Sequence, residues 1–196
     1  MSAVTLDLIK ELRVTTGVSM MACKAALEEA NGDIQKAIDL LRKKGMTKAA
    51  ERAGRETKNG FIGSYVHSTG RIGVLVEVAC ETDFVAKSPD FTSLAHDIAM
   101  QIAASDPIVI APADVDPALV AKEAVIWQEQ LKTEGKPEKI WPNILKGKEQ
   151  KFREEKALLS QPFVKNPDIT IEKLLAEGVI KLGENIQVRR FTRFSI

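Results

Sequence analysis

The spacing of the apolar residues changes along the chain, and this change constrains the fold more than any other feature of the sequence. In the first 45 residues the apolar positions recur every three or four residues, which is typical of amphipathic helices. Between Phe61 and Cys80 they alternate with other residues, which is typical of strands. Helical patterns return afterwards. The sequence therefore predicts an α+β fold, with a helical N-terminal part and a core that contains a short antiparallel sheet.

The helical N-terminal part predicts three short helices with clear boundaries. A residue that can cap a helix N-terminus precedes each apolar stripe, and a glycine follows it. The predicted caps are Thr5, Ser19 and Asp33. The glycines are Gly17, Gly32 and Gly45. Helices this short are not stable alone, so we expect the three stripes to bury one another in a small module.

Residues 46–60 are polar and basic, and they include two glycines. This composition predicts a linker that could be partly helical. We therefore expect two domains. Residues 1–54 form the helical module with its linker, and residues 55–196 form the α+β core.

The predicted sheet has three strands. Phe61–His67 and Ile72–Cys80 form a hairpin around Ser68-Thr69-Gly70. The tail, Ile186–Ile196, alternates well enough to be the third strand. One face of the second strand carries Ile72, Val74, Val76 and Val78. One face of the tail carries Ile186, Val188, Arg190, Thr192 and Phe194.

The rest of the core predicts four helices. Ser88 can cap the first, with Pro89 at its first position. The others are expected at residues 116–131, at the charged segment 144–159, and at residues 170–177.

The residue types give little support for catalysis. The chain has two histidines and two cysteines, so a metal site would need further ligands gathered by the fold. A site built from Cys80, His67 and Asp83 is not expected, because His67 lies at the hairpin turn and Cys80 at the far end of the arm. At about 3.3 Å per residue these two side chains are tens of ångströms apart. There is no phosphate-binding glycine motif. We expect no enzyme activity, no metal and no cofactor.

The overall charge argues against two classes of partner. The formal net charge is +1, so we expect no direct nucleic-acid binding and no membrane binding. No apolar run reaches the length that spans a membrane, and an amphipathic pattern starts within a few residues of Met1. The two cysteines lie in apolar surroundings, as reduced thiols do. A cytoplasmic protein is expected.

Two short segments carry apolar residues that a small fold does not need. Met20 and Met21 are adjacent on a predicted helix and diverge by about 100°, so they cannot share one core. Either one packs inside and the other fills a gap, or one meets a partner. Residues 82–85 place an acid and an aromatic ring directly after a strand. They are either a capped helix start with Phe84 folded onto the core, or a binding wedge.

Three runs of sequence, taken together, decide between these alternatives. They are LRVTTGVSMMACKAALEEANGDIQKAIDLLRKKG at Leu12–Gly45, GRIGVLVEVACETDFVAKSPDF at Gly70–Phe91, and QPFVKNPDITIEKLL at Gln161–Leu175. In this order they resemble the bacterial elongation factor Ts family, whose N-terminal module is similar to ubiquitin-associated domains. Residues 107–156 match only loosely.

The resemblance implies a nucleotide-exchange factor that binds elongation factor Tu and accelerates release of its GDP. It implies that Thr82, Asp83, Phe84 and Val85 reach the partner's nucleotide domain, with Phe84 as an aromatic wedge and Asp83 as its acidic companion. Wedging there would disturb the site that holds Mg²⁺ and the phosphates. Met20, Met21 and Lys24 match positions where the helical module meets another face of the same domain.

The resemblance also bears on assembly. Longer family members have two similar halves in the core, whereas these 196 residues have room for one. We expect a homodimer in which two sheets pack together through the face of Ile72, Val74, Val76 and Val78, with Val76 near its own mate. Two other functions stay open from the residues: an adaptor or ribosome-binding module, and a small hydrolase that uses Cys80.

Overall fold

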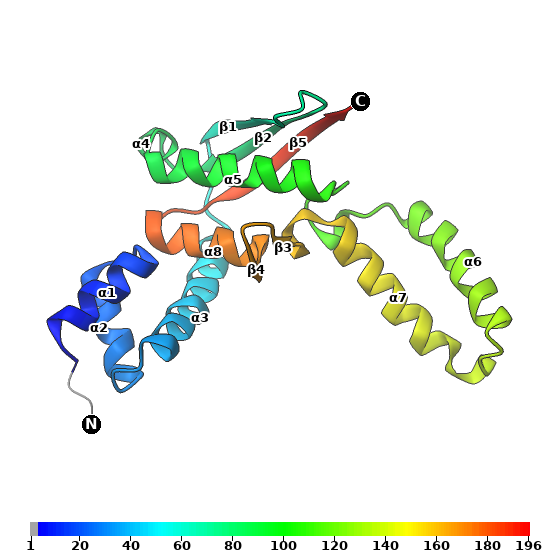
Figure 1. Ribbon diagram of the computed structural model, residues 1–196, viewed down its shortest axis with the longest axis horizontal. Helices are drawn as coiled ribbons and strands as arrows, with labels where there is room; N and C mark the ends of the chain where they lie inside the picture. Colours follow the sequence, from blue (N-terminus) through cyan, green and yellow to red (C-terminus); the bar gives the residue numbers. More distant parts are fainter. Residues whose placement is uncertain (1–3) are drawn as a thin grey trace.

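The chain forms a helical module, an α+β core and a long helical hairpin, in the arrangement of Figure 1. The computed structural model describes residues 4–196, except for the side chains of residues 46–50. The module consists of α1 (Leu6–Thr16), α2 (Met20–Glu29) and the first part of α3 (Ile34–Arg52). This module lies at one end of the molecule, and the hairpin lies at the other.

The predicted caps of the module are confirmed. Thr5 Oγ1 accepts a hydrogen bond from Leu8 N at 3.3 Å, and Ser19 Oγ accepts one from Ala22 N at 3.4 Å. Asp33 Oδ1 accepts one from Lys36 N at 3.0 Å. The three helices bury one another's apolar stripes, as expected. The buried side chains are Ile9, Leu12, Val18, Cys23, Ala26, Leu27, Ala30, Ala37 and Leu41.

The predicted end of the third helix at Gly45 is wrong, because α3 continues to Arg52. The glycine serves close packing instead. A Cβ atom built at Gly45 would overlap Cδ1 of Ile180 on α8 (Ile171–Leu182). Much of the predicted linker is therefore helix, and β1 (Asn59–Val66) begins within it.

The main sheet contains β1, β2 (Ile72–Cys80) and β5 (Gln187–Ser195), all antiparallel, in the order β1-β2-β5. The predicted hairpin and C-terminal strand are confirmed. A second, small sheet joins β3 (Pro162–Phe163) to β4 (Asn166–Thr170).

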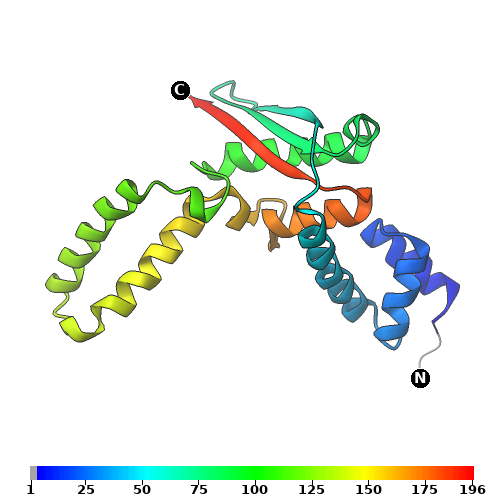
Figure 2. The same cartoon turned by 180° about the vertical axis from the view of Figure 1, so that it is seen from behind.

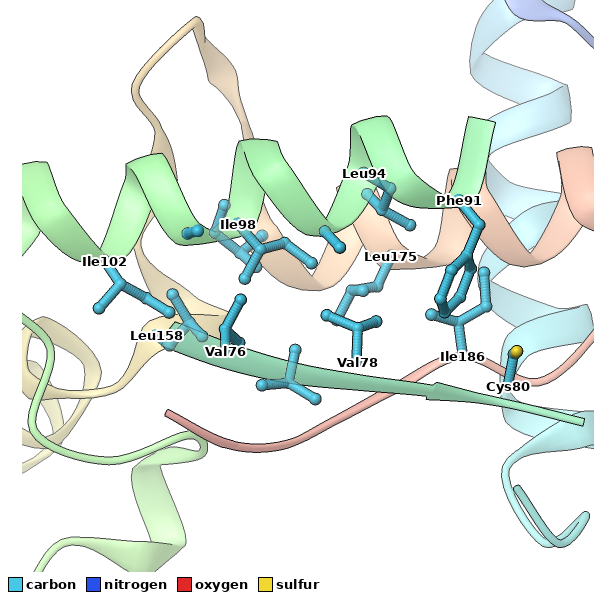
Figure 3. Close-up of a cluster of buried hydrophobic side chains, with 14 of the residues drawn as sticks. Val76, Val78, Cys80, Phe91, Leu94, Ile98, Ile102, Leu158, Leu175 and Ile186 are labelled. Carbon is cyan, nitrogen blue, oxygen red and sulfur yellow. The ribbon is translucent and has the colours of Figure 1, made fainter. Parts of the chain in front are cut away.

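One long helix covers one face of the main sheet. This helix, α5 (Pro89–Ser105), is capped by Ser88 as predicted and packs on β1 and β2. Figure 3 shows it over β2. The sheet side chains beneath it include Val74, Val76 and Val78. Val76 is 1% exposed, so the expectation that this face packs on a second copy is wrong. The chain covers it from within, because a helix as long as α5 matches the length of the strands.

A β-bulge changes the predicted alternation in β5. Glu77 pairs with Arg190 but the next residue, Val78, pairs with Val188, so Arg189 is extra. Beyond an extra residue, the side chains change faces. Phe191 consequently packs against the core, while Phe194 is 69% exposed on the opposite face. The prediction that Val188 and Phe194 share a face is wrong.

The loosely matching middle segment forms the projecting hairpin. Its arms are α6 (Pro117–Thr133) and α7 (Trp141–Lys156), which Figures 1 and 2 show extending away from the sheet. Trp127 and Phe152 join the arms, with ring centroids 5.7 Å apart. Short 3-10 turns occur at Pro112–Asp114, Glu138–Ile140 and Leu158–Ser160. Among the described residues, no helix has the length and apolarity needed to cross a membrane.

Candidate partner-binding site

The segment after β2 forms a single helical turn, α4 (Asp83–Ala86), that presents an aromatic ring to solvent. Thr82 is its N-cap, and Thr82 Oγ1 accepts a hydrogen bond from Val85 N at 3.3 Å. Val85 and Ala86 are buried in the core and anchor the turn, whereas Phe84 is 83% exposed. One of the two predicted alternatives was a capped helix start with Phe84 folded onto the core. The capped helix start is confirmed, but the position of Phe84 in that alternative is wrong.

Asp83 is held by a charged neighbour one helical turn away. Lys87 Nζ donates a hydrogen bond to Asp83 Oδ2 at 2.8 Å, and both side chains are well exposed. This hydrogen bond lowers the pKa of Asp83 and raises the pKa of Lys87. Asp83 is therefore a carboxylate at neutral pH, and its charge is offset within the same turn.

Two acidic side chains fix the turn to a loop that lies about one hundred residues further along the chain. Glu184 Oε2 accepts hydrogen bonds from Glu81 N and Thr82 N, both at 3.0 Å, and Glu184 Oε1 accepts one from Thr82 Oγ1 at 2.6 Å. In return, Asn185 N donates to Glu81 Oε1 at 2.7 Å. The pKa of Glu81 is lowered mainly by this hydrogen bond from Asn185 and to a smaller extent by the charge of nearby Arg55.

The sequence reasoning missed Glu184 and Glu81. Glu81 directly precedes the predicted element, but nothing in its neighbours indicates a partner at residues 184–185. No local sequence pattern connects Glu81 with Glu184, because they are 103 positions apart, so only the tertiary structure reveals this contact.

The helical module carries the second predicted element on α2. Met20 is half-buried and packs against the module core, whereas Met21 is 76% exposed. The two methionines therefore diverge as their spacing predicts. Lys24 is exposed, with its ammonium 3.7 Å from Glu28 Oε1. Val14 on α1 is also an exposed apolar side chain that the sequence reasoning missed. Val14 lies outside the helical stripe of Ile9 and Leu12, and this position in the sequence could have indicated that its side chain is exposed.

The structure places the two elements on different parts of the fold. Residues 82–85 belong to the core, and residues 20–24 belong to the module. Figures 1 and 2 show α4 and α2 at the same end of the molecule, opposite the α6–α7 hairpin. A partner that touched both would meet two separate contact surfaces.

The structure separates Cys80 from His67, as the sequence predicted. Cys80 is buried, and burial raises the pKa of its thiol to about 11, so it is protonated at neutral pH. The strand register places Cys80 opposite Asn59, at the end of the hairpin away from His67. Within residues 4–196, excluding the undescribed side chains, no group of three or more His, Cys, Asp or Glu residues could hold a metal ion.

The sequence is similar to one family over almost its whole length. The family model described as elongation factor TS matches residues 13–196. A relative from Carboxydothermus hydrogenoformans is 52% identical, and the match covers 98% of this chain and 89% of the relative. One from Desulfosudis oleivorans is 50% identical over 100% and 99% of the two chains. One from Fervidobacterium nodosum is 49% identical over 98% of each. All three are named elongation factor Ts.

Proposed function

Because this chain belongs to the elongation factor Ts family, whose role is nucleotide exchange in translation elongation, we propose that it binds elongation factor Tu with GDP bound and accelerates GDP release. The observation that carries the proposal is Phe84, an aromatic side chain 83% exposed on an anchored turn. An exposed phenylalanine has a cost in water, of about 25 cal/mol for each Å² of apolar surface. A partner that buries the ring removes this cost.

The proposed mechanism is linkage between two binding equilibria. A factor that binds the nucleotide-free GTPase more tightly than the GDP-bound form must weaken GDP binding by the same factor. Phe84 acts as the wedge, with Thr82, Asp83 and Val85 in the same turn. Mg²⁺ neutralises phosphate charge, so displacing its surroundings weakens GDP binding without breaking a covalent bond. The chain itself performs no bond chemistry and uses no cofactor, nucleic acid or membrane, and it acts in the cytoplasm.

Met20, Met21 and Lys24 provide the proposed second contact. An exposed methionine such as Met21 adapts its shape to a partner surface. In this proposal residues 1–54 form the module that adds affinity, and residues 55–196 form the core that carries the wedge.

We also propose that the chain forms a homodimer through the outer face of the main sheet. This is the face opposite α5. Its exposed apolar side chains are Ile62, Val66, Leu75 and Phe194. The same face carries an ion pair between Arg190 and Glu77, with Nε and Oε2 2.6 Å apart, next to Ile62 in the strand register. A two-fold axis through this face would let two sheets pack on each other.

The test is the release of a fluorescent GDP analogue from purified elongation factor Tu, with and without this protein. The proposal expects a large acceleration with the wild-type chain and little with Phe84→Ala. If the wild-type chain does not change the release rate, the exchange function is wrong. Capture of ribosomes in place of the GTPase would then favour an adaptor.

A further inference from the structure

The loop between α8 and β5 is joined by four hydrogen bonds to the two residues before α4. One carboxylate, Glu184, accepts from two consecutive backbone N–H groups and from one hydroxyl, at 3.0, 3.0 and 2.6 Å. All three donors belong to Glu81 and Thr82, the two residues directly before α4. Hydrogen bonds to a charged group are stronger than neutral ones, so this contact restricts the start of the turn.

The hydroxyl of Thr82 makes this restriction directional. Its hydrogen is directed to Glu184, which leaves its oxygen lone pairs to accept from Val85 N at 3.3 Å. Without Glu184 the hydroxyl could rotate and the cap would weaken. Because α4 has only four residues, the loss of one cap affects the whole turn that carries Phe84.

The same loop is tied to the helix that holds the module. Glu184 follows Gly183, which ends α8 in the left-handed conformation with φ of +78°. Two residues of α8, Glu177 and Ile180, contact α3. The loop that bonds to the start of α4 therefore continues directly from the helix that packs against α3.

We propose that Glu184 is a positioning residue for nucleotide exchange, which holds the Phe84 turn in the orientation that the partner requires. This rests on the proposed function, and it adds a residue that would act through Thr82 and α4 and would not touch the partner itself. In this role Glu184 chiefly sets the maximal rate of exchange, because a misplaced wedge can still bind.

The first experiment needs only this chain. Hydrogen exchange of the peptide that contains residues 81–86 is compared among the wild type, Glu184→Ala, Glu184→Gln and Glu172→Ala. Glu172 is an exposed carboxylate on α8, the helix that precedes Glu184, so it controls for charge. Glu184→Ala removes all three bonds and should speed the exchange of this peptide about tenfold or more, as expected when charge-assisted bonds are lost. Glu184→Gln can keep the two backbone bonds through its amide oxygen, but it loses the charge and the acceptor of the Thr82 hydroxyl. Its exchange should therefore lie between those of the wild type and Glu184→Ala.

The second experiment measures GDP release at saturating concentrations of each variant. Glu184→Ala should lower the maximal rate about tenfold, since small misplacements have such effects. Glu184→Gln should restore part of the rate, and Glu172→Ala should have no effect. In a double-mutant cycle, Glu184→Ala should add less than about twofold to the loss from Phe84→Ala, because both act through one ring.

The outcomes separate the two proposals. If the wild type accelerates GDP release and Glu184→Ala keeps the full maximal rate, Glu184 does not position the wedge. Losses that multiply in the cycle would likewise overturn it, since they indicate an effect independent of Phe84. If the wild type does not accelerate release, the exchange function is wrong and the positioning role falls with it, while the hydrogen-exchange result still reports on the contact.

Discussion

Arg42 on α3 and Glu177 on α8 form an ion pair with 3.0 Å between Nε and Oε1, and this pair joins the N-terminal module to the core. Both side chains are more than one-third exposed, so the pair contributes about 0–1 kcal/mol. Gly45 on the same helix leaves room for Ile180, since a Cβ atom at this position would overlap the Ile180 side chain. Close packing of α3 on α8 therefore contributes to this joint in addition to charge.

Phe84→Ala should leave the melting temperature close to that of the wild type, because the ring is exposed and packs on little of the protein. The same variant should lower the rate of stimulated GDP release by an amount equivalent to about 2 kcal/mol, which is typical of an interface anchor. Phe91→Ala is the matched control, since Phe91 is fully buried. That variant should lose about 3–5 kcal/mol of stability. A marked loss of melting temperature in Phe84→Ala would contradict the exposed wedge.

Gly45→Ala should destabilise the joint between module and core, although alanine is normally the better helix former by about 1 kcal/mol. The added methyl group overlaps Ile180, and overpacking of this kind costs about 1–3 kcal/mol. Ile180→Ala should relieve the overlap, so the double variant should be more stable than the sum of the single effects. Chemical denaturation of the four chains measures this, and simple additivity would show that Gly45 and Ile180 do not clash.

Leu75→Asp should convert a dimer of twice the 21.5 kDa chain mass into a folded monomer. Leu75 is 49% exposed on the outer face, so in a monomer the new charge stays in water. Val76→Asp is the control on the inner face, where a charge would be buried beneath α5 and the chain should unfold. Sedimentation with circular dichroism distinguishes the two results. A wild-type monomer at micromolar concentration would rule out the proposed dimer.

The Asp83–Lys87 pair should keep the turn insensitive to pH around neutrality. The hydrogen bond lowers the pKa of Asp83 below 3.8, so its stabilisation is present above that value and is lost as pH falls through the lowered pKa. The same hydrogen bond raises the pKa of Lys87 above 10.5. The stabilisation that comes from the charged lysine is therefore present below 10.5 and is lost as pH rises through the raised pKa. Lys87→Met should return the pKa of Asp83 towards its usual value, which carboxyl-carbon NMR titration measures. An unchanged pKa would mean that the pair does not form.

Cys80 should react very slowly with a thiol reagent at pH 8 in the native chain, because its pKa is about 11 and the side chain is buried. Cys80→Ala should leave stimulated GDP release unchanged. A hydrolytic activity of the wild type that Cys80→Ala abolished, without a loss of folding, would support the alternative of a cysteine hydrolase.

Much of the fold could be predicted because its signals are local. The caps Thr5, Ser19 and Ser88 bond to N–H groups three residues away, and the hairpin turn involves adjacent residues. Such contacts form wherever the same few residues occur together, so their pattern in the sequence is sufficient. For the candidate site, the residues alone left Phe84 between core and surface, and family resemblance favoured the surface.

Tertiary contacts decided the rest, because they join residues that are far apart in the chain. Gly45 does not end a helix. A glycine is needed there because Ile180, which is distant in the sequence, leaves no room for a Cβ atom. The face of Val76 is covered by α5, and one extra residue at Arg189 turns Phe191 inward and Phe194 outward. Glu184 reaches Thr82 across 102 positions. The sequence alone determined most of the helices, the three strands of the main sheet and which short elements stand out. Packing determined which faces of those elements are buried, which elements contact one another and how they are oriented. The energy of each such contact depends on a partner residue that the local pattern does not specify.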